Sequence, residues 1–155
     1  MAQTVKKMIV VLVNIRSREN VGSIFRTADA VGVDKIYLCG ITPMPPHDKI
    51  SKTALGAEEY VSWEYHKQTA RLLKKLRDEG LGLIALEQTT DAVNIFKLKT
   101  LGSRPIALIV GNEVKGLSPQ ILKYCDKKIA IPMYGKKESL NVAVAFGIAV
   151  YQLLK

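Results

Sequence analysis

One arginine lies in a segment that otherwise has the composition of a protein core. Arg26 belongs to the run NVGSIFRTADAVGV, residues 20–33, in which most of its neighbours are small or apolar. Asn20 can cap a helix at the start of this run, and Gly22, one turn before Arg26, allows another backbone to approach. A guanidinium stays charged at every ordinary pH, so Arg26 either extends into solvent or serves a ligand site. A lone arginine most often does the former, so a site needs support from other segments.

A second polar segment, IVGNEVKGLS at residues 109–118, contains Gly111, Glu113 and Gly116 in the spacing Gly-x-Glu-x-x-Gly. It follows an apolar run and ends at Ser118, which can cap a helix that has proline in its first turn. This order predicts a tight loop with exposed backbone amides and one carboxylate. An ordinary strand-to-helix turn has the same features, so the segment identifies no function by itself.

A third segment, residues 129–150, passes from an apolar strand through a loop with Lys136 and Lys137 into an apolar helix. Ser139 is the expected N-cap of that helix. Asn141 would then lie in the first turn, where a buried amide without partners is costly. We therefore expect a ligand or a loop to satisfy the Asn141 side chain.

Several other kinds of chemistry lack their residue patterns. Neither the dinucleotide fingerprint G-x-G-x-x-G nor the phosphate loop G-x-x-x-x-G-K-[ST] occurs. His47 and His66 have no evident partner for hydrolase chemistry. Cys39 and Cys125 show no C-x-x-C spacing, which predicts no metal site and favours a reducing, cytoplasmic setting.

Length and charge limit the class of protein. A chain of 155 residues, 48% of them hydrophobic, is expected to form one domain. The net charge of +9 leaves two interpretations open, a polyanionic partner such as nucleic acid or solubility alone. The N-terminal MAQTVKK lacks the apolar core of a signal peptide. Residues 139–154 are uncharged but shorter than the ~20 residues of a membrane span, so no membrane association is expected.

The elements that position these segments alternate along the chain. Apolar runs without polar alternation predict strands covered on both faces of a parallel sheet, at residues 8–13, 35–39, 81–86, 105–110 and 127–131, with a weaker edge candidate at 61–65. Helices are expected at residues 20–31, 69–80, 118–125 and from about 139 to 154, and residues 40–52 form a proline-rich loop. The pattern predicts an α/β domain, a mostly parallel sheet flanked by helices.

The last helix is apolar almost all round, from Leu140 through Phe146 to Leu153. Its own sheet can cover only one side of it, so a second subunit is the expected cover for the other.

Taken in order, the three polar segments resemble the motifs of the SpoU-type, TrmH-like RNA 2′-O-ribose methyltransferases of the SPOUT superfamily. The matches are Asn-x-Gly-x-x-x-Arg at 20–26, Gly-x-Glu-x-x-Gly at 111–116 and Ile-Pro-Met…Ser-Leu-Asn at 131–141. The resemblance covers essentially the whole chain. It implies a single catalytic domain, residues 1–155, without an additional RNA-binding domain. It also implies a C-terminal deep trefoil knot and a homodimer.

The resemblance further implies S-adenosylmethionine as methyl donor, held by backbone groups of three loops that include Leu86, Gly111, Ile131, Met133 and Leu140. The catalytic set is Asn20, Arg26, Glu113, Ser139 and Asn141. In this set Arg26 anchors a phosphate and stabilises charge on the ribose oxygen, and Glu113 orders the loops or pairs with Arg26. Ser139 and Asn141 shape the pocket where ribose meets the methyl group.

Basic residues flank the motifs and are the expected contacts to RNA phosphates: Arg16, Arg18, Lys115, Lys136 and Lys137. Some of them could equally be a solvated rim. Few exposed aromatic residues are expected for base stacking. The expected substrate is a tRNA first and ribosomal RNA second. Two alternatives stay open: a catalytically inactive knotted RNA-binding protein, and a different α/β nucleotide-binding module.

Overall fold

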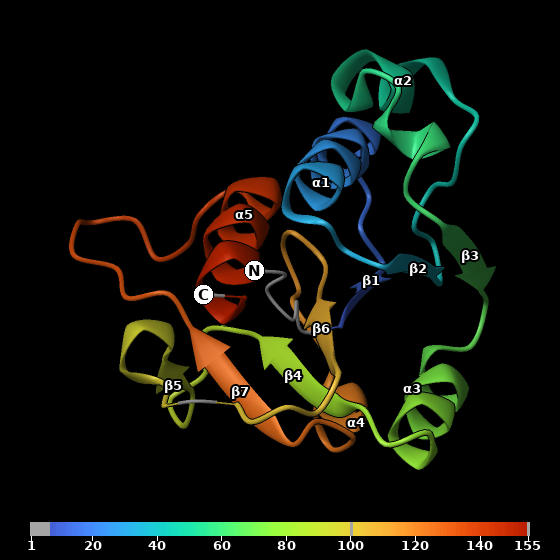
Figure 1. The fold of residues 1–155 in the computed structure, drawn as a ribbon. Helices are drawn as coiled ribbons and strands as arrows, with labels where there is room; N and C mark the ends of the chain where they lie inside the picture. The colour runs from blue at the N-terminus through green and yellow to red at the C-terminus, as the bar shows by residue number, and fades with distance from the viewer. Residues whose placement is uncertain (1–6, 100, 155) are drawn as a thin grey trace, which may run out of the picture.

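A single parallel sheet forms the centre of the computed structural model, which describes residues 7–99 and 101–154 (Figure 1). Within these residues the strand order is β3-β2-β1-β6-β4-β7-β5, and every neighbouring pair is parallel. The strands are β1 (Met8–Val13), β2 (Lys35–Cys39), β3 (Trp63–His66), β4 (Gly82–Leu86), β5 (Val93–Asn94), β6 (Ile106–Val110) and β7 (Lys127–Ala130). The predicted α/β class and parallel sheet are confirmed.

Helices cover both faces of the sheet (Figure 1). Helices α1 (Arg18–Val31), α2 (Asp48–Ala54) and α5 (Val142–Leu153) contribute to the apolar core on one face. Helices α3 (Thr69–Asp78) and α4 (Pro119–Leu122) contribute to the core on the other. Two short 3₁₀ helices, η1 (Ala57–Glu59) and η2 (Ile95–Lys97), lie in connections.

Strand β1 is apolar at every position because both of its faces are covered. Met8, Val10 and Leu12 lie in the core under α1 and α5, whereas Ile9, Val11 and Val13 lie in the core under α3. Each of the six is 5% exposed or less. Both faces of a central strand are therefore removed from water, which is the general condition for strands of a parallel sheet.

The starts of two helices differ from the sequence prediction. Ser17, not Asn20, is the N-cap of α1, because its Oγ accepts a hydrogen bond from the Asn20 backbone N–H at 3.1 Å. Likewise Asn141, not Ser139, caps α5, since its Oδ1 accepts from the N–H groups of Ala143 and Val144. The predicted cap Ser118 does cap α4, although that helix ends at Leu122 rather than at 125. The predictions for Asn20 and Ser139 as caps were wrong.

The segment 40–52 is not wholly irregular. His47 accepts a hydrogen bond from the Lys49 N–H and so caps helix α2. Helix α2 packs so closely on α1 that a Cβ at Gly22 would overlap the Ile50 carbonyl. Gly22 therefore serves the close approach of two helices.

The edges of the sheet differ in how well they were predicted. Strand β3 lies at one edge, as its weak alternation predicted, but spans Trp63–His66 rather than 61–65. The two-residue strand β5 forms the other edge and was not predicted.

Among the described residues, no helix is long and apolar enough to cross a bilayer. The first six residues, part of the segment that shows no signal peptide, lie outside the described residues.

Candidate active site

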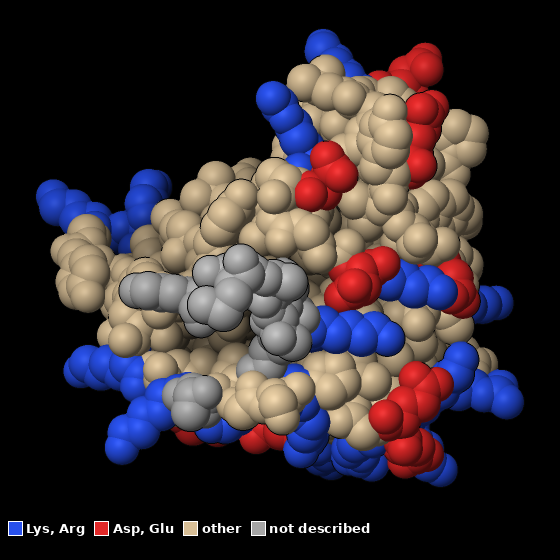
Figure 2. All heavy atoms as spheres, viewed as in Figure 1, with Lys and Arg blue, Asp and Glu red and all other residues tan. Residues whose placement is uncertain are grey.

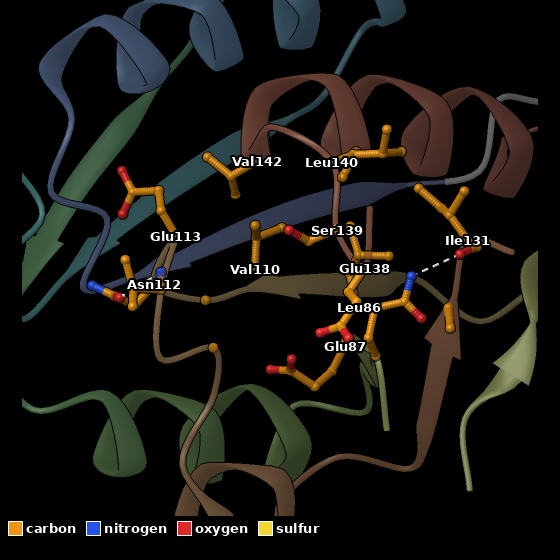
Figure 3. A pocket seen from close by; sticks show the side chains of 16 residues that line it. Leu86, Glu87, Val110, Asn112, Glu113, Ile131, Glu138, Ser139, Leu140 and Val142 are labelled. Atoms are coloured by element: carbon orange, nitrogen blue, oxygen red, sulfur yellow. Dashed lines mark hydrogen bonds between the residues drawn. The ribbon is translucent and has the colours of Figure 1, made fainter. Parts of the chain in front are cut away.

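A cavity of about 400 Å³ opens at the carboxyl ends of β4, β6 and β7 (Figure 3). Its walls come from the residues that follow these three strands and from the segment before α5. In parallel α/β sheets this edge is where ligands usually bind. Apolar and carboxylate side chains share the wall, among them Leu86, Val110, Glu113 and Leu140 (Figure 3).

Most of the predicted donor-binding residues meet here. Leu86, Gly111, Ile131 and Leu140 all line the cavity. Met133 does not line it and is half-buried two residues further along the chain. The predicted catalytic residues divide between two positions. Glu113 and Ser139 line the cavity, whereas Asn20, Arg26 and Asn141 lie outside its lining.

The carboxylate of Glu113 ties the second motif to the first. Its two oxygens accept hydrogen bonds from the backbone N–H groups of Arg16 and Ser17, each at 2.9 Å. The Asn20 side-chain amide donates a third bond at 3.3 Å. Burial raises the pKa of Glu113, but these bonds to the charged form outweigh it, so its pKa lies below the ordinary value. Glu113 thus orders the loop after β1, and among the described residues it forms no ion pair with Arg26.

Asn20 connects this loop to the third motif. The Asn141 Nδ2 donates to Asn20 Oδ1 at 3.1 Å, while the Asn20 amide donates to Glu113. We call the chain of side chains Glu113–Asn20–Asn141 the polar bridge. The Asn141 Oδ1 meanwhile caps α5. The side chain that was expected to need a loop or a ligand is therefore satisfied by the protein itself.

Two residues that sequence reasoning missed hold the loops of the cavity together. Glu87 Oε2 accepts a hydrogen bond from the Leu117 N–H at 2.6 Å. Gln88 Nε2 donates to the Ile131 carbonyl at 2.7 Å, the dashed line in Figure 3. Both follow the predicted strand 81–86 directly, so their position at its carboxyl end was an available signal.

The loop after β6 is fixed in shape from within. The Asn112 amide donates to the Asn14 carbonyl at 2.7 Å and its Oδ1 accepts from the N–H groups of Val114 and Lys115. A Cβ at Gly111 would lie 2.7 Å from the backbone carbon of Gly116. The glycine of the second motif is thus required by the close return of its own loop.

Arg26 projects from α1 as an exposed side chain. It forms no hydrogen bond or ion pair within residues 7–99 and 101–154. Its guanidinium is therefore open to a ligand or to another subunit. The exposed position also agrees with an ordinary surface arginine, so geometry alone leaves its role a prediction.

The predicted RNA contacts are all exposed: Arg16, Arg18, Lys115, Lys136 and Lys137. In Figure 2, Lys and Arg side chains project from the loop between β7 and α5, at the left of the view. The surface offers more aromatic side chains than expected. Tyr134, in this same loop, is 90% exposed, and Tyr60 is 79% exposed.

Metal and thiol chemistry have little support. Among the described residues, no group of three or more His, Cys, Asp or Glu side chains is placed to hold a metal ion. Burial raises the pKa of Cys39 to about 12 and that of Cys125 to about 11, which keeps both thiols protonated.

Comparisons with known proteins agree with this geometry. The profile of the SpoU rRNA Methylase family matches residues 7–151. The tRNA (guanosine(18)-2′-O)-methyltransferase of Aquifex aeolicus is 36% identical over 148 residues, which cover 95% of this chain and 68% of the relative. Several other curated relatives are longer, and the chain spans less than two thirds of their length.

Two solved structures are similar over nearly the whole chain. The AdoMet-bound rRNA methyltransferase from Sinorhizobium meliloti has a TM-score of 0.89 and 27% identity, covering 99% of this chain and 57% of its own. A second, described as "Structural insights into the 2-OH methylation of C/U34 on tRNA", has a TM-score of 0.83 and 26% identity, covering 96% and 94%. The family match over residues 7–151 and the 36% identical relative show that the chain belongs to the SpoU rRNA methylase family.

Proposed function

We propose that this chain is an S-adenosylmethionine-dependent RNA 2′-O-ribose methyltransferase. The observation that carries the proposal is the convergence of three distant segments on one edge of the sheet. Residues after β4, β6 and β7 enclose the cavity, and the polar bridge joins the second and third motifs to the first. Family membership supports the same activity. An inactive RNA-binding protein would have no need of a small-molecule cavity at the ends of these strands.

The cavity suits S-adenosylmethionine in size and in character. Its volume of about 400 Å³ lies within the range of ~300–1,000 Å³ for small-ligand sites. Leu86, Val110 and Leu140 supply apolar wall, and the carboxylates of Glu87 and Glu138 supply negative charge for a cationic ligand. Loop amides and carbonyls at Gly111 and Ile131 would hold the adenine and the ribose. Bound there, the donor supplies a methyl group on a sulfonium centre.

Arg26 then has the role of anchoring RNA. A ribose 2′-hydroxyl is a weak acid, so the site must stabilise the negative charge that develops on its oxygen. A guanidinium with a pKa above ~12 is a poor base but an effective bidentate partner for phosphate. Ser139, exposed on the cavity wall, would shape the pocket for the ribose. Glu113 positions the loop that leads into the helix of Arg26.

The proposed substrate is a tRNA first and ribosomal RNA second. The Aquifex aeolicus relative is named for guanosine 18 of tRNA, and one similar structure concerns position 34 of tRNA. The Sinorhizobium meliloti structure is described as an rRNA methyltransferase, which keeps ribosomal RNA as the second candidate. The net charge of +9 favours either polyanion. A substrate RNA and two unpaired thiols both favour the cytoplasm as the location.

The oligomeric state and the path of the chain belong to the same proposal. Val144 and Tyr151 leave α5 with an apolar exposed side, 52% and 55% exposed respectively. We propose that a second copy of the chain covers this side, as a homodimer in which Arg26 of one subunit helps to complete the site of the other. We also propose that the segment between β7 and α5 is threaded through the preceding loops as a trefoil knot, an uncommon connection in proteins.

A methyl-transfer assay tests the function directly. The protein is incubated with tritiated S-adenosylmethionine and unmodified tRNA or rRNA transcripts, and the RNA is digested and analysed by mass spectrometry. We expect a single 2′-O-methylated nucleoside at one position. Binding of donor and RNA with no transfer to any transcript would instead support the inactive RNA-binding alternative.

A further inference from the structure

A second hollow lies directly beside the donor cavity. This side groove, of about 700 Å³, is lined by residues that include Asn14, Arg16, Thr69 and Lys115. Asn112, Val114 and Gly116 line both hollows, so only the loop after β6 separates them. The side groove follows the carboxyl ends of β1 and β2 toward the start of α3, where Thr69 lies.

A third hollow continues past the start of α3. Its volume is about 510 Å³, and we call it the basic pocket; it is lined by His66, Lys67, Gln68, Arg71, Leu72 and Lys75. The three cations of the pocket are exposed to solvent: Lys67, Arg71 and Lys75. Leu72 is only 2% exposed and forms the apolar floor of the pocket. Gln68 of the basic pocket and Thr69 of the side groove are consecutive, so the two hollows adjoin the same point of the chain.

In the part of the chain that the structure describes, no carboxylate pairs with the cations of the basic pocket. Glu64, the carboxylate near it, is engaged by Lys35 and by His66. Within residues 7–99 and 101–154, none of Lys67, Arg71 and Lys75 forms an ion pair. Burial, and to a smaller extent the nearby charges of Lys75 and Lys35, lower the pKa of His66.

We propose that the side groove and the basic pocket form one track for the phosphodiester backbone of the substrate RNA. The track leaves the donor cavity across the loop after β6, passes Arg16 and Lys115, and ends at Lys67, Arg71 and Lys75. Strands β6, β1, β2 and β3 are consecutive in the sheet, so the track spans three strand spacings, about 14 Å at ~4.8 Å each. That is long enough for several nucleotides.

RNA fits this track better than a compact ligand does. The cations are long, flexible side chains distributed along the hollow, which suits a chain of phosphates rather than one enclosed anion. Apolar surfaces at Ile41, 64% exposed, and Val114, 85% exposed, lie between them and can contact sugars and bases. The inference rests on the proposed function for the direction of the track, because the RNA must also reach the donor cavity.

The test removes the charge of the basic pocket and measures binding of unmodified tRNA against salt. The variant is Lys67→Gln, Arg71→Gln and Lys75→Gln together. Each lost phosphate contact lowers the slope of log affinity against log salt by about 0.7–0.9. We expect the slope to fall by about 2 and the affinity to fall about tenfold or more at 0.15 M salt. In the methylation assay the KM for tRNA should rise while kcat at saturating RNA is kept.

A matched control removes three charges elsewhere: Lys52→Gln, Lys97→Gln and Lys127→Gln. These lysines are exposed on α2, η2 and β7 and form no ion pair among the described residues. We expect the control variant to keep most of the tRNA affinity. Equal losses in both variants would mean that net charge alone matters and would overturn the track.

Two readouts separate this inference from the proposed function. Calorimetric binding of S-adenosylmethionine and the melting temperature should be the same in all three proteins. If the wild type transfers methyl groups to tRNA and the basic-pocket variant keeps its salt slope, the track is wrong and the function stands. If the salt slope of the basic-pocket variant falls as expected relative to the wild type, but the wild type transfers no methyl group, the function fails and the track stands. A wild type that binds no RNA overturns both.

Discussion

Replacing Glu113 with glutamine removes the charge from the residue that ties two motif loops together. In the wild type, its two oxygens accept from the Arg16 and Ser17 N–H groups at 2.9 Å. Glutamine of the same shape can keep one of these bonds, but its NH₂ group then faces the other N–H. Hydrogen bonds to a charged group contribute ~1.5–3 kcal/mol each when buried. This carboxylate is only half-buried, so we take ~1 kcal/mol for each.

The expected loss is therefore about 1–2 kcal/mol of unfolding free energy at pH 7, because the bond that glutamine keeps is also weaker; this is about 2–8 °C in melting temperature for a chain of this size. Urea denaturation followed by circular dichroism measures it. The matched control is Glu59→Gln, because Glu59 is an exposed carboxylate on η1. We expect the control to change stability by less than ~0.5 kcal/mol.

The pH dependence gives a second, sharper test. The pKa of Glu113 is lowered from its ordinary value of 4.5 in the folded protein. Its contribution is therefore fully present above pH 4.5 and is lost as the pH falls through the folded pKa. The difference in stability between wild type and Glu113→Gln should be constant from pH 7 to about 5 and shrink below 4.5. A difference that is absent at pH 7, or that grows in acid, would refute this reasoning.

Three further substitutions test other parts of the site. Arg26→Ala should lower methyl transfer at least ~100-fold while the donor affinity measured by calorimetry changes less than ~2-fold, because Arg26 is outside the cavity lining. A variant with half of the wild-type activity would contradict its role. Gly111→Ala should weaken donor binding and lower stability by ~1–3 kcal/mol, because its Cβ would meet the Gly116 backbone. Gly135→Ala, where a Cβ meets nothing within 4 Å, is its control, and equal calorimetric results would contradict the prediction. Val144→Glu, on the exposed side of α5, should sediment as a monomer if that side forms the dimer; a wild type that is already monomeric at micromolar concentration would exclude the interface.

The central strands were predictable because burial on both faces leaves a direct signal. Residues 8–13 and 35–39 match β1 and β2 to the residue. Strand β5 was not predictable, since Val93 and Asn94 are too few to show any periodicity. Helix α2 was hidden by the prolines that precede it, and its N-cap is a histidine rather than one of the usual capping residues.

The members of the site were easier to predict than their contacts. Gly111, Glu113 and Ile131 lie at the cavity because parallel strands end at one edge of the sheet. The caps of α1 and α5 were placed on the wrong residues, since local sequence offers two candidates at each helix start. Asn20 is instead engaged by Glu113 and Asn141, partners 93 and 121 residues away in sequence. Such pairings have no local signature.

The polar bridge has a consequence for how the protein folds. Its bonds join residues separated by 93 and 121 positions in a chain of 155, and the bond from Arg16 to Glu113 spans 97. Contacts of such long range require large loops to close first, and they slow folding in general. During synthesis the first helix can pack on its strands long before Asn141 leaves the ribosome. All seven strands of the described residues precede residue 131, so the polar bridge can close only after the residues of the whole sheet have been synthesised.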